Sequence, residues 1–549
     1  MKNLLLIIIV CLIAGKAFAD HIIVQGEVSG QWNVDTVLVI GDLSIPDGET
    51  LLINPGTLVL FQGSYVINVK GAMIAAGNDN DTIYFSIADS TGFHADTIPD
   101  GGWRGIRLDD IRTSNETSVF YRCRFTYGKN VSQDTVIGNG GAIYVNKYNK
   151  VVIDECRFQD NFTTYNGGAV YLDSADITIK NSVFVNNRCG PEVAPWGYGG
   201  AIAADNSSPD IRWNVFSGNS STGIGGGMSV RYKDCNIYNN VFSGNFSGLG
   251  GGLGILHIPE CTHRINTNLF AENIALYFGG GVANVNASPV YINNTIVGNS
   301  AMYGGGFYCN YSISPDFYNT IFWGNQAGVG PTGYLFAVSS QADFYYCDVE
   351  GGPAQFGGSG GGVAFSGAFE QCLDEDPQFR GAGEHPYELT WDSPCYETGS
   401  PDTSGFYLPE TDLADSPRLS HGAIDMGAYE IVWVGVREKE TGRQGEGEKR
   451  RPGDRERIED VKIWPNPFTD RVFVEVDAKK GEAITIEVFD ISGRKLKEAQ
   501  LQNPGSGKQQ FMIGMNDLPT GGIYLIRTVL DKNFVTCKLV RNLPQSNTE

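Results

Sequence analysis

The chain has 549 residues, of which 71 are Gly and only 23 are Pro, and its formal net charge at pH 7 is −22. This composition excludes a collagen-like fibre and a disordered low-complexity polymer, and it favours short strands joined by tight turns. A strongly acidic protein repels phosphate backbones, so we expect no nucleic acid partner, and it also repels a polyuronate unless a divalent cation bridges the two.

The first 19 residues are typical of a secretory signal peptide. Lys2 supplies the positive start, residues 4–14 form an apolar run, and Ala17 and Ala19 provide a cleavage site of small residues. The apolar run is short for a membrane span, and no later stretch is long and apolar enough for one. We therefore expect an exported mature chain without a transmembrane segment.

The cysteines are compatible with export. Of the eleven Cys residues only Cys11 lies in the predicted signal peptide. Disulfides form readily in exported proteins, and no CxxC or Cys/His spacing indicates a zinc or redox site. The sequence leaves the pairing open, and Cys372 with Cys395 is the pair that we expect.

A repeat of about 26 residues is the decisive feature of the chain. Each unit has a Phe or Ile inside an apolar triplet and an Asn three places later. The apolar positions are Phe158, Phe184, Phe216, Phe242, Phe270, Ile296 and Phe322, and the Asn positions are Asn161, Asn187, Asn219, Asn245, Asn273, Asn299 and Asn325. Each unit also contains a Gly pair, from Gly140 and Gly141 to Gly305 and Gly306. Two marks that stay in phase indicate a repeat architecture.

The units predict an all-β fold, a parallel β-helix. Each has room for two or three short strands and lacks helical periodicity, and it is shorter than a propeller blade. One unit per coil places equivalent residues about 4.8 Å apart. We expect an interior Phe column and buried Asn ladders, because each buried amide then finds a partner in the next coil. A second Asn ladder is expected at Asn214, Asn240, Asn268 and Asn294.

Segments on both sides of the repeat resemble a known family, the secreted right-handed parallel β-helix repeat proteins. The similar segments are residues 41–63 and 102–106 at the front and residues 376–379, 393–395 and 424–430 at the back. The resemblance extends the predicted β-helix over residues 20–435. Because a solenoid exposes unpaired strand edges at its ends, we expect the irregular front and back segments to cap it.

The chain changes character after the predicted β-helix. Residues 436–460 contain no aromatic side chain and mix charges of both signs, which predicts a flexible, solvated linker. Residues 461–549 contain alternating apolar and polar stretches between turn signals, as in a small Ig-like β-sandwich. The sequence therefore predicts a second, separate domain at the C-terminus.

Three motifs in residues 461–549 resemble the C-terminal sorting domain of type IX secretion. The residues that carry the resemblance are Pro465, Asn466, Pro467, Phe468, Gly493, Arg494, Gly522 and Tyr524. The doubled Gly at 521–522 makes the last motif one residue longer than its usual form. The resemblance implies recognition by the type IX translocon of a Gram-negative type of bacterium, and a mature protein that is secreted or attached to the outer cell surface.

The fold does not decide the activity, because parallel β-helices include lyases, hydrolases and adhesins. None of the six His lies in a recognisable nucleophile motif. His257 and His263 flank Cys261, but this spacing matches no known metal-ligand set, and a polar turn explains it better. The carboxylate pair of a glycoside hydrolase cannot be selected among so many acidic residues.

A polysaccharide lyase needs an Arg or Lys base beside Ca²⁺ ligands. If the strands have the predicted phase, Asp154, Lys180, Arg212 and Asp210 lie together on the outside of consecutive coils and form a candidate catalytic cluster. A solvated ladder of opposite charges explains these residues equally well. Ca²⁺ is the cofactor that such a site implies, although the carboxylates are few.

Outward aromatic side chains indicate a binding function instead. Tyr144, Tyr171, Tyr238 and Tyr318 are placed to project from strands, where they can stack on sugars or simply cover the sheet. We therefore expect an exported, cell-surface-attached protein that binds polysaccharide or matrix. The alternative is a polysaccharide lyase or glycoside hydrolase that acts on an extracellular glycan.

Overall fold

The computed structural model describes residues 21–132, 134, 138–190, 196–258, 264–311, 313–419 and 423–431, followed by seven strands between residues 461 and 541 with Met515 and Leu518. The chain divides into two compact units, residues 1–431 and 432–549. The predicted signal peptide and linker lie outside the described residues, so the boundaries at residues 19, 435 and 460 remain predictions.

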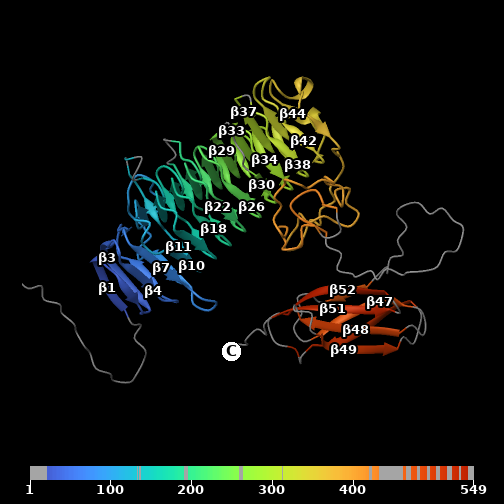
Figure 1. Cartoon of the computed structure of the whole chain (residues 1–549), viewed down its shortest axis with the longest axis horizontal. Helices are drawn as coiled ribbons and strands as arrows, with labels where there is room; N and C mark the ends of the chain where they lie inside the picture. Colours follow the sequence, from blue (N-terminus) through green and yellow to red (C-terminus); the bar gives the residue numbers. More distant parts are fainter. Residues whose placement is uncertain are drawn as a thin grey trace, which may run out of the picture. The chain divides into compact units, whose positions relative to one another are not determined.

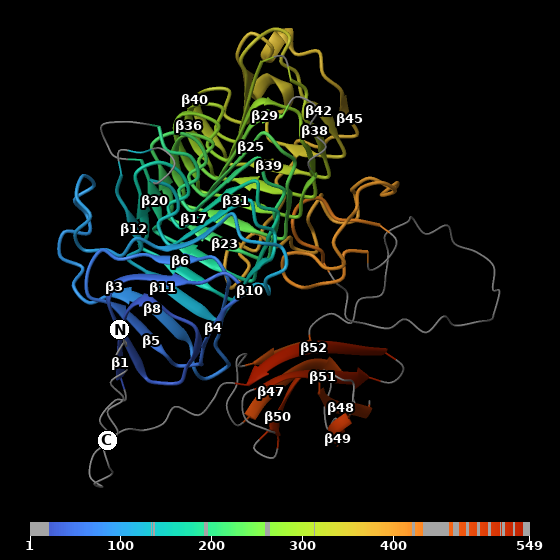
Figure 2. The same cartoon turned by 60° about the vertical axis from the view of Figure 1, so that its left-hand side comes forward.

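The first unit is a solenoid of short parallel strands, stacked coil upon coil (Figures 1 and 2). Most coils contribute one strand to each of ladders 1, 2 and 3, and the middle coils add a strand to ladder 4. Strands of neighbouring coils pair in parallel, for example β14 (Val151–Asp154) with β18 (Thr178–Lys180), so that Ile153 lies beside Ile179. The predicted parallel β-helix is confirmed.

The four ladders are defined by their strands. Ladder 1 consists of β6 (Ile67–Val69), β9 (Ile106–Asp109), β13 (Ile143–Asn146), β17 (Val170–Asp173), β21 (Ile202–Asp205), β25 (Met228–Arg231), β29 (Leu253–Ile258), β33 (Val282–Ala287), β37 (Phe307–Asn310), β41 (Gly333–Leu335) and β44 (Phe356–Gly357). Ladder 2 consists of β2 (Gly30–Trp32), β4 (Thr50–Ile53), β7 (Ala72–Ala76), β10 (Ser118–Tyr121), β14, β18, β22 (Asp210–Arg212), β26 (Asn236–Tyr238), β30 (Arg264–Asn266), β34 (Val290–Ile292), β38 (Asp316–Tyr318), β42 (Asp343–Tyr345) and β45 (Phe369–Glu370).

Ladders 3 and 4 complete the solenoid. Ladder 3 consists of β1 (His21–Glu27), β3 (Thr36–Ile45), β5 (Leu58–Phe61), β8 (Ile83–Ile87), β11 (Cys123–Thr126), β15 (Arg157–Gln159), β19 (Val183–Val185), β23 (Val215–Ser217), β27 (Val241–Ser243), β31 (Leu269–Ala271), β35 (Thr295–Val297), β39 (Ile321–Trp323) and β43 (Asp348–Val349). Ladder 4 consists of β12 (Lys129–Asn130), β16 (Phe162–Thr163), β20 (Arg188–Cys189), β24 (Ser220–Ser221), β28 (Phe246–Leu249), β32 (Ile274–Phe278), β36 (Ser300–Tyr303) and β40 (Gln326–Val329). The long strand β3 pairs with both β5 and β6 and so joins ladders 1 and 3.

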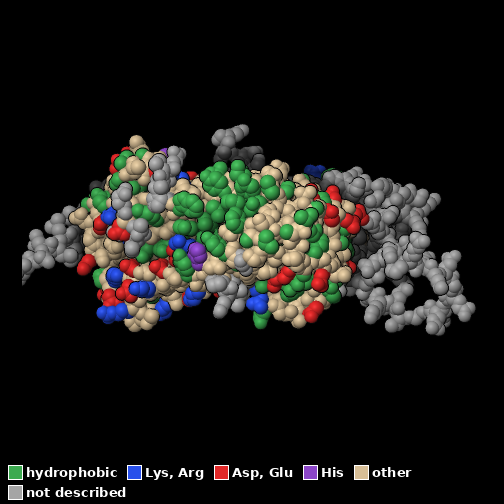
Figure 3. Space-filling model, turned by 90° about the horizontal axis from the view of Figure 1, so that it is seen from above, with side chains coloured by type: hydrophobic (Ala, Val, Ile, Leu, Met, Phe, Trp, Pro, Cys, Tyr) green, Lys and Arg blue, Asp and Glu red, His purple; other side chains and the backbone are tan. Residues whose placement is uncertain are grey.

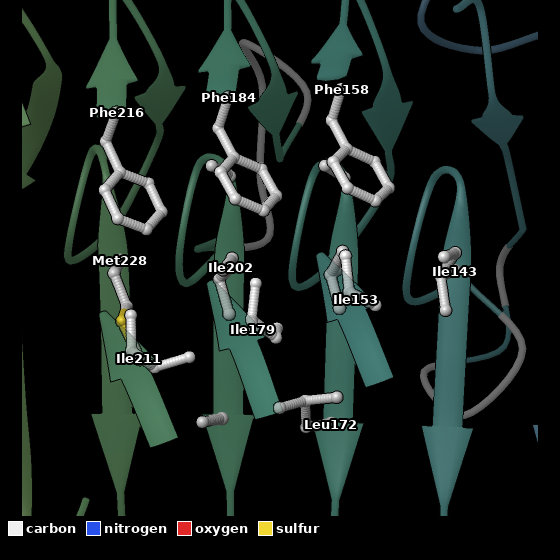
Figure 4. Packing of buried hydrophobic residues seen from close by; sticks show 14 of the residues in the cluster. Ile143, Ile153, Phe158, Leu172, Ile179, Phe184, Ile202, Ile211, Phe216 and Met228 are labelled. Carbon is white, nitrogen blue, oxygen red and sulfur yellow. The ribbon is translucent and has the colours of Figure 1, made fainter. Parts of the chain in front are cut away.

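Equivalent apolar side chains fill the interior of the solenoid. The rings of Phe158, Phe184, Phe216, Phe242 and Phe270 are fully buried and stack with centroids 4.6–5.0 Å apart. Figure 4 shows the first three of them side by side above the smaller core residues. The predicted Phe column is confirmed, and it begins earlier than the repeat indicates, because Phe85 and Phe125 stack in the same way.

The predicted Asn ladders are also present. The Nδ2 of Asn245 donates to the Phe216 carbonyl and to Oδ1 of Asn273, both at 2.9 Å. Its Oδ1 accepts hydrogen bonds from the backbone N–H and Nδ2 of Asn219, at 3.0 and 2.9 Å. Each buried amide therefore forms hydrogen bonds with backbone groups of the turns. Without it, these groups would be buried with no hydrogen-bond partner. The ladder that contains Asn214 and Asn240 repeats this pattern one corner earlier.

The Gly pairs have two separate causes, which Gly199 and Gly200 illustrate. Gly199 has φ +67, a left-handed conformation that favours glycine at this corner. A Cβ at Gly200 would lie 2.1 Å from the carbonyl oxygen of Gly226 in the next coil, so only glycine allows the backbones to approach this closely. The pair is thus required by both the turn and the stacking.

The two parts of the back segment have different positions. The last coil is closed by the 3-10 helices η1 (Gly352–Gln355) and η2 (Gly362–Ala364), with Phe356 and Phe369 packed on Phe344. Residues 395–419 and 423–431 instead lie along the side of the solenoid, beside β30 and β38 (Figure 1). Asn239 donates to the Thr411 carbonyl and Asn293 to the Asp425 carbonyl, at 3.0 and 2.7 Å. The segment that includes the family-like residues 424–430 therefore covers a side of the solenoid, where we had expected an end cap.

This lateral segment buries several charges. Arg418 and Glu430 form an ion pair at 3.1 Å and are almost completely buried. The Asp425 carboxylate accepts hydrogen bonds from the backbone N–H groups of Glu397 and Ile431, at 2.7 and 2.6 Å. Burial raises the pKa of Asp425 to about 6, and the two hydrogen bonds and Arg418 oppose that rise. We therefore expect the stability of this segment to depend on pH.

The second unit contains two antiparallel sheets. Their strands are β46 (Val461–Trp464), β47 (Arg471–Ala478) and β50 (Gly507–Gly514) in one, and β48 (Ala483–Asp490), β49 (Lys495–Gln502), β51 (Gly522–Leu530) and β52 (Asn533–Arg541) in the other. Val472 and Val474 of the first sheet pack with Ile484, Ile486 and Val488 of the second in one buried core. This is the small β-sandwich that the sequence predicts.

The buried Asn ladder can be tested at Asn245. Because Asn245→Ala leaves the Phe216 carbonyl and the Asn219 donors without partners, we expect the free energy of unfolding to fall by about 3–5 kcal/mol. Asn236→Ala, which removes an exposed Asn on β26, should change it by less than about 0.5 kcal/mol. Urea unfolding followed by circular dichroism measures both, and equal small effects would contradict the ladder's role.

The Asp425 carboxyl predicts a pH dependence. A pKa raised in the folded state means that the fold binds this proton more tightly than the unfolded chain does, so the stabilisation is complete below about pH 4 and is lost as the pH rises through about 6. We expect the Asp425 carboxyl by itself to make opening of residues 395–419 and 423–431 easier by about 2 kcal/mol between pH 4 and pH 7, and Glu430, whose pKa is raised to about 9, to act in the same direction. Hydrogen exchange of the Ile431 and Glu397 amides, corrected for intrinsic rates, measures this, and Asp425→Asn should weaken the pH dependence.

Candidate functional site

The charged residues selected from the sequence lie on the outer face of ladder 2. Asp154 on β14 is paired with Lys180 on β18, and Lys180 is paired with Arg212 on β22. Asp210 lies two residues before Arg212 on the same strand. The structure therefore brings all four side chains together on three consecutive coils, as the predicted strand phase requires.

These four residues form two ion pairs. Lys180 Nζ lies 3.2 Å from Asp154 Oδ2, and Arg212 Nη1 lies 2.9 Å from Asp210 Oδ2. Arg212 Nη1 also donates to the hydroxyl of Tyr238 on the next coil, at 2.6 Å. All four charges are thus compensated by a partner within the row, which is the pattern of a ladder of opposite charges.

The electrostatics of the row do not favour a catalytic base. A lyase base must lose its proton at working pH, which requires a lowered pKa. The hydrogen bond to Tyr238 and the negative charge of Asp210 instead raise the pKa of Arg212. Asp154 and Asp210 are each engaged by a cation, and no group of three His, Cys, Asp or Glu side chains in the described residues is arranged to hold a metal ion. The catalytic and Ca²⁺ hypotheses thus gain no support from this geometry.

Of the three residues considered for a metal site at the His257 turn, the structure describes only His257. The ring of His257 stacks on that of Tyr232, with centroids 5.6 Å apart. Cys261 and His263 lie outside the described residues, so their relation to His257 remains a prediction.

Two of the predicted outward tyrosines are covered. Tyr144 and Tyr171 extend from ladder 1 away from the core, but they are 3% and 6% exposed. The Arg107 guanidinium lies 4.0 Å from the centre of the Tyr144 ring, and the Tyr171 hydroxyl donates to Asp205 at 2.9 Å. A sugar cannot reach these rings. These rings are buried because side chains of neighbouring coils pack over them. The sequence of a single unit does not reveal this packing.

The other two predicted tyrosines are half-buried on ladder 2. The ring of Tyr238 lies 5.9 Å from the Arg212 guanidinium. Tyr318 stacks on Tyr345 with centroids 4.9 Å apart, and its other neighbour is Phe406 of the lateral segment, at 5.1 Å. Their rings are therefore largely engaged by protein neighbours.

A different surface, on ladder 4, exposes apolar side chains. We call it the ladder 4 patch, and its members are Trp196, Phe246, Ile274, Leu276, Tyr277, Met302 and Val329. They come from β28, β32, β36 and β40 and from the turn before β21, and each is 44–59% exposed. In Figure 3 hydrophobic side chains gather over the middle coils of the solenoid. Large exposed apolar patches are uncommon on soluble proteins, and where they occur they often mark binding sites.

A groove of about 130 Å³ crosses the patch. Its lining residues are Trp196, Thr222, Gly223, Gly248, Leu249, Leu276 and Tyr277. A Cβ at Gly248 would lie 2.7 Å from the Gly223 carbonyl oxygen, and a Cβ at Gly223 would lie 2.5 Å from that of Gly197. Stacked glycine backbones therefore contribute to the lining, and Trp196 and Tyr277 contribute aromatic rings from different coils.

This groove is not evident from the sequence. Gly223 and Gly248 look like ordinary turn residues, and Trp196 lies in the longest of the repeat units, outside its regular pattern. The sequence carries a signal only for the surrounding patch: the apolar residues Phe246 and Ile274 stand one place after Asn245 and Asn273, where an ordinary turn would be polar.

The expected disulfide between Cys372 and Cys395 is wrong. No bond joins them in the structure, and the buried Cys395 Sγ instead donates to Asp348 Oδ2 at 3.2 Å. The Cys372 Sγ instead donates to the Glu370 carbonyl at 3.4 Å. The reason is that residues 395–431 turn away along the side of the solenoid, whereas Cys372 still belongs to its last coil.

Comparison with known families identifies both units. Residues 130–301 match the family described as right handed beta helix region, and residues 462–542 match the secretion system C-terminal sorting domain. The chain is a right-handed β-helix protein with a type IX secretion sorting domain. A search of curated proteins gave no match to the β-helix protein.

The sorting domain indicates export of the β-helix protein through the type IX system to the cell surface or beyond. Of the predicted motif residues, Gly522 begins β51 and Tyr524 is buried in the sandwich core. Pro465, Asn466, Pro467, Phe468, Gly493 and Arg494 lie outside the described residues. Within the described part of the chain, no helix has the length and apolarity to span a membrane.

The charged row of ladder 2 predicts a small effect of mutation. The side chains of Arg212 and Asp210 are about a third exposed, so their attraction is screened by water. We expect Arg212→Ala to lower the free energy of unfolding of the β-helix protein by less than about 1 kcal/mol. Urea unfolding of Arg212→Ala, Asp210→Ala and the double variant measures the coupling, and a coupling above about 2 kcal/mol would contradict an exposed ion pair.

Proposed function

We propose that the β-helix protein is a surface adhesion protein that binds a neutral extracellular polysaccharide along the ladder 4 patch. The observation that carries the proposal is the groove between Trp196 and Tyr277, in which two aromatic rings and apolar side chains are exposed on a rigid parallel sheet. Aromatic rings provide flat apolar surfaces that suit the C–H faces of sugar rings.

The geometry of the groove suits a ligand that is itself a repeat. Trp196, Gly223, Gly248 and Tyr277 come from four consecutive coils, which are about 4.8 Å apart along the solenoid. An extended polysaccharide that follows the solenoid axis therefore meets a new set of contacts at each coil. Gly223 and Gly248 have no side chain that would keep a sugar ring away from this part of the groove.

The charge of the protein selects among polysaccharides. None of the residues that line the groove is charged, and the chain as a whole carries a formal charge of −22. A polyuronate or sulfated glycan would be repelled at long range and would find no cation in the groove. A neutral glycan is not repelled and needs no cation in the groove, so it is the ligand class that we propose.

Export through the type IX system places such a surface where extracellular glycans occur. The sorting domain belongs to the second unit, and the groove to the first, so delivery and binding use different parts of the chain. The paired charges of ladder 2 make a lyase or glycoside hydrolase the less supported alternative. Catalytic turnover is nevertheless an outcome that the same experiment records.

The test compares binding of the purified protein to neutral and anionic glycans. We expect retardation in affinity gels that contain a neutral glycan, and about a 2- to 10-fold loss of affinity in Trp196→Ala and in Tyr277→Ala, because each removes one stacking ring. Trp391→Ala is the matched control, since Trp391 is a similarly exposed ring in the back segment, outside the groove lining. It should bind as the unaltered protein does.

Three results would contradict the proposal. Binding to polyuronates in preference to neutral glycans would contradict the ligand class. Equal losses of glycan affinity in Trp391→Ala and Trp196→Ala would contradict the proposed position of the binding site. Release of reducing ends, or absorbance at 235 nm on polyuronates, that disappears in Lys180→Ala or Arg212→Ala would instead support the catalytic cluster on ladder 2.

A further inference from the structure

One corner of the solenoid carries a column of small polar residues between ladders 2 and 3. In order, its members are Cys123, Cys156, Ser182, Asn214, Asn240, Asn268, Asn294, Thr320, Cys347 and Cys372. The residue before each of them has a positive φ, for example Tyr346 at 53 and Gln371 at 54. All ten therefore occupy the same position of the same turn in successive coils, with cysteine pairs at both ends of the column.

The thiols replace the amides of this column in their hydrogen bonds. Asn240 Nδ2 donates to the Ile211 carbonyl of the preceding coil and to the Tyr238 carbonyl two residues earlier, both at 2.9 Å. Cys347 Sγ makes the equivalent contacts to the carbonyls of Phe317 and Tyr345, at 3.3 and 3.4 Å.

The backbone fixes Cys347 and Cys372 beside each other. Tyr345 is paired with Glu370 before them, and Asp348 is bridged to Leu373 after them. The Leu373 N–H donates to the Cys347 carbonyl at 2.8 Å. Parallel strands are about 4.8 Å apart, which lies within the Cα separation of about 4.4–6.8 Å that a disulfide requires. A disulfide joins Cβ atoms about 3.5–4.5 Å apart, slightly closer than the spacing of about 4.8 Å between parallel strands.

The two cysteine pairs differ in accessibility. Cys123 and Cys156 are 1% and 2% exposed, and burial holds the pKa of Cys123 well above its usual range. Cys347 is fully buried, but Cys372 is partly exposed. The neighbouring Cys347 thiol lowers the pKa of the Cys372 thiol, which makes Cys372 the better nucleophile of this pair.

We propose that Cys347 and Cys372 are joined by a disulfide in the exported protein. The Cys372 thiolate attacks a disulfide-bearing oxidant, a protein or small-molecule disulfide of the exporting compartment, and releases one thiol of that oxidant. The Cys347 thiolate then attacks the mixed disulfide at the Cys372 sulfur and releases the second thiol. Two protein thiols are oxidised to one disulfide, and one oxidant disulfide is reduced to two thiols. Cys123 and Cys156 stay reduced, because no oxidant reaches them in the folded coil.

The bond would fasten the last coil of the solenoid. Strand β45 is the final strand of ladder 2 and has only two residues, and the ring of Phe369 lies 5.8 Å from that of Phe344 in the coil below. A terminal coil has a neighbour on one side only, so it opens more easily than a central one. A covalent link between adjacent turns limits this opening.

The direct test is peptide mapping of the protein as it is secreted. Free thiols are alkylated during denaturation, the protein is digested without reductant, and the peptides are identified by mass spectrometry. We expect one linked peptide pair that contains Cys347 and Cys372, with Cys123 and Cys156 alkylated. Alkylation of both Cys347 and Cys372, or a link from Cys372 to Cys395, would overturn the proposal.

A second measurement concerns the effect of the bond on the folded protein. Hydrogen exchange of the amides of residues 344–349 should become at least about tenfold faster when reductant is added to the unaltered protein. In Cys372→Ser these amides should exchange fast with and without reductant, whereas Cys156→Ser, at the other end of the column, should keep the response. Exchange that does not respond to reductant in the unaltered protein would contradict the role of the bond.

Discussion

The structure of the β-helix depends on one constraint: each coil must satisfy the buried polar groups of its neighbour at a fixed spacing of about 4.8 Å. The Asn245 amide shows how it is met, because it binds the Phe216 carbonyl on one side and Asn273 on the other. The same fixed spacing between coils stacks the rings of Phe216 and Phe242, with centroids 4.6 Å apart. Since like residues lie beside like, a side chain that fits one coil is selected again in the next.

The same constraint separates the inside of the solenoid from its outside. Interior and corner positions are fixed by stacking, whereas outward positions need only be compatible with the strand. On ladder 2 those positions carry paired charges such as Lys180 and Asp154. On ladder 4 they carry exposed apolar side chains such as Leu276 and Tyr277. The proposed binding role rests on the difference between these two surfaces and not on the fold.

Much of the fold could be predicted from the sequence because the repeat is regular where stacking is strictest. The Phe column and both Asn ladders were predicted residue by residue, and the motifs of residues 461–549 indicated the sorting domain. The groove could not be predicted, because it depends on glycine backbones and on Trp196, which lies outside the regular unit. The burial of Tyr171 depends on Asp205 in the next coil. The Cys372–Cys395 pair was wrong because the sequence does not show where the chain leaves the solenoid.

Spin labels on ladder 2 test the in-register stacking most directly. Thr178, Asp316 and Asp343 occupy equivalent positions, with five coil steps from β18 to β38 and six to β42. The account predicts that pulsed dipolar spectroscopy gives mean distances of about 24 Å for Thr178 with Asp316 and about 29 Å for Thr178 with Asp343, each with a narrow distribution. Distances that are equal, that decrease with the number of coils or that spread broadly would contradict the stacking of like residues on like.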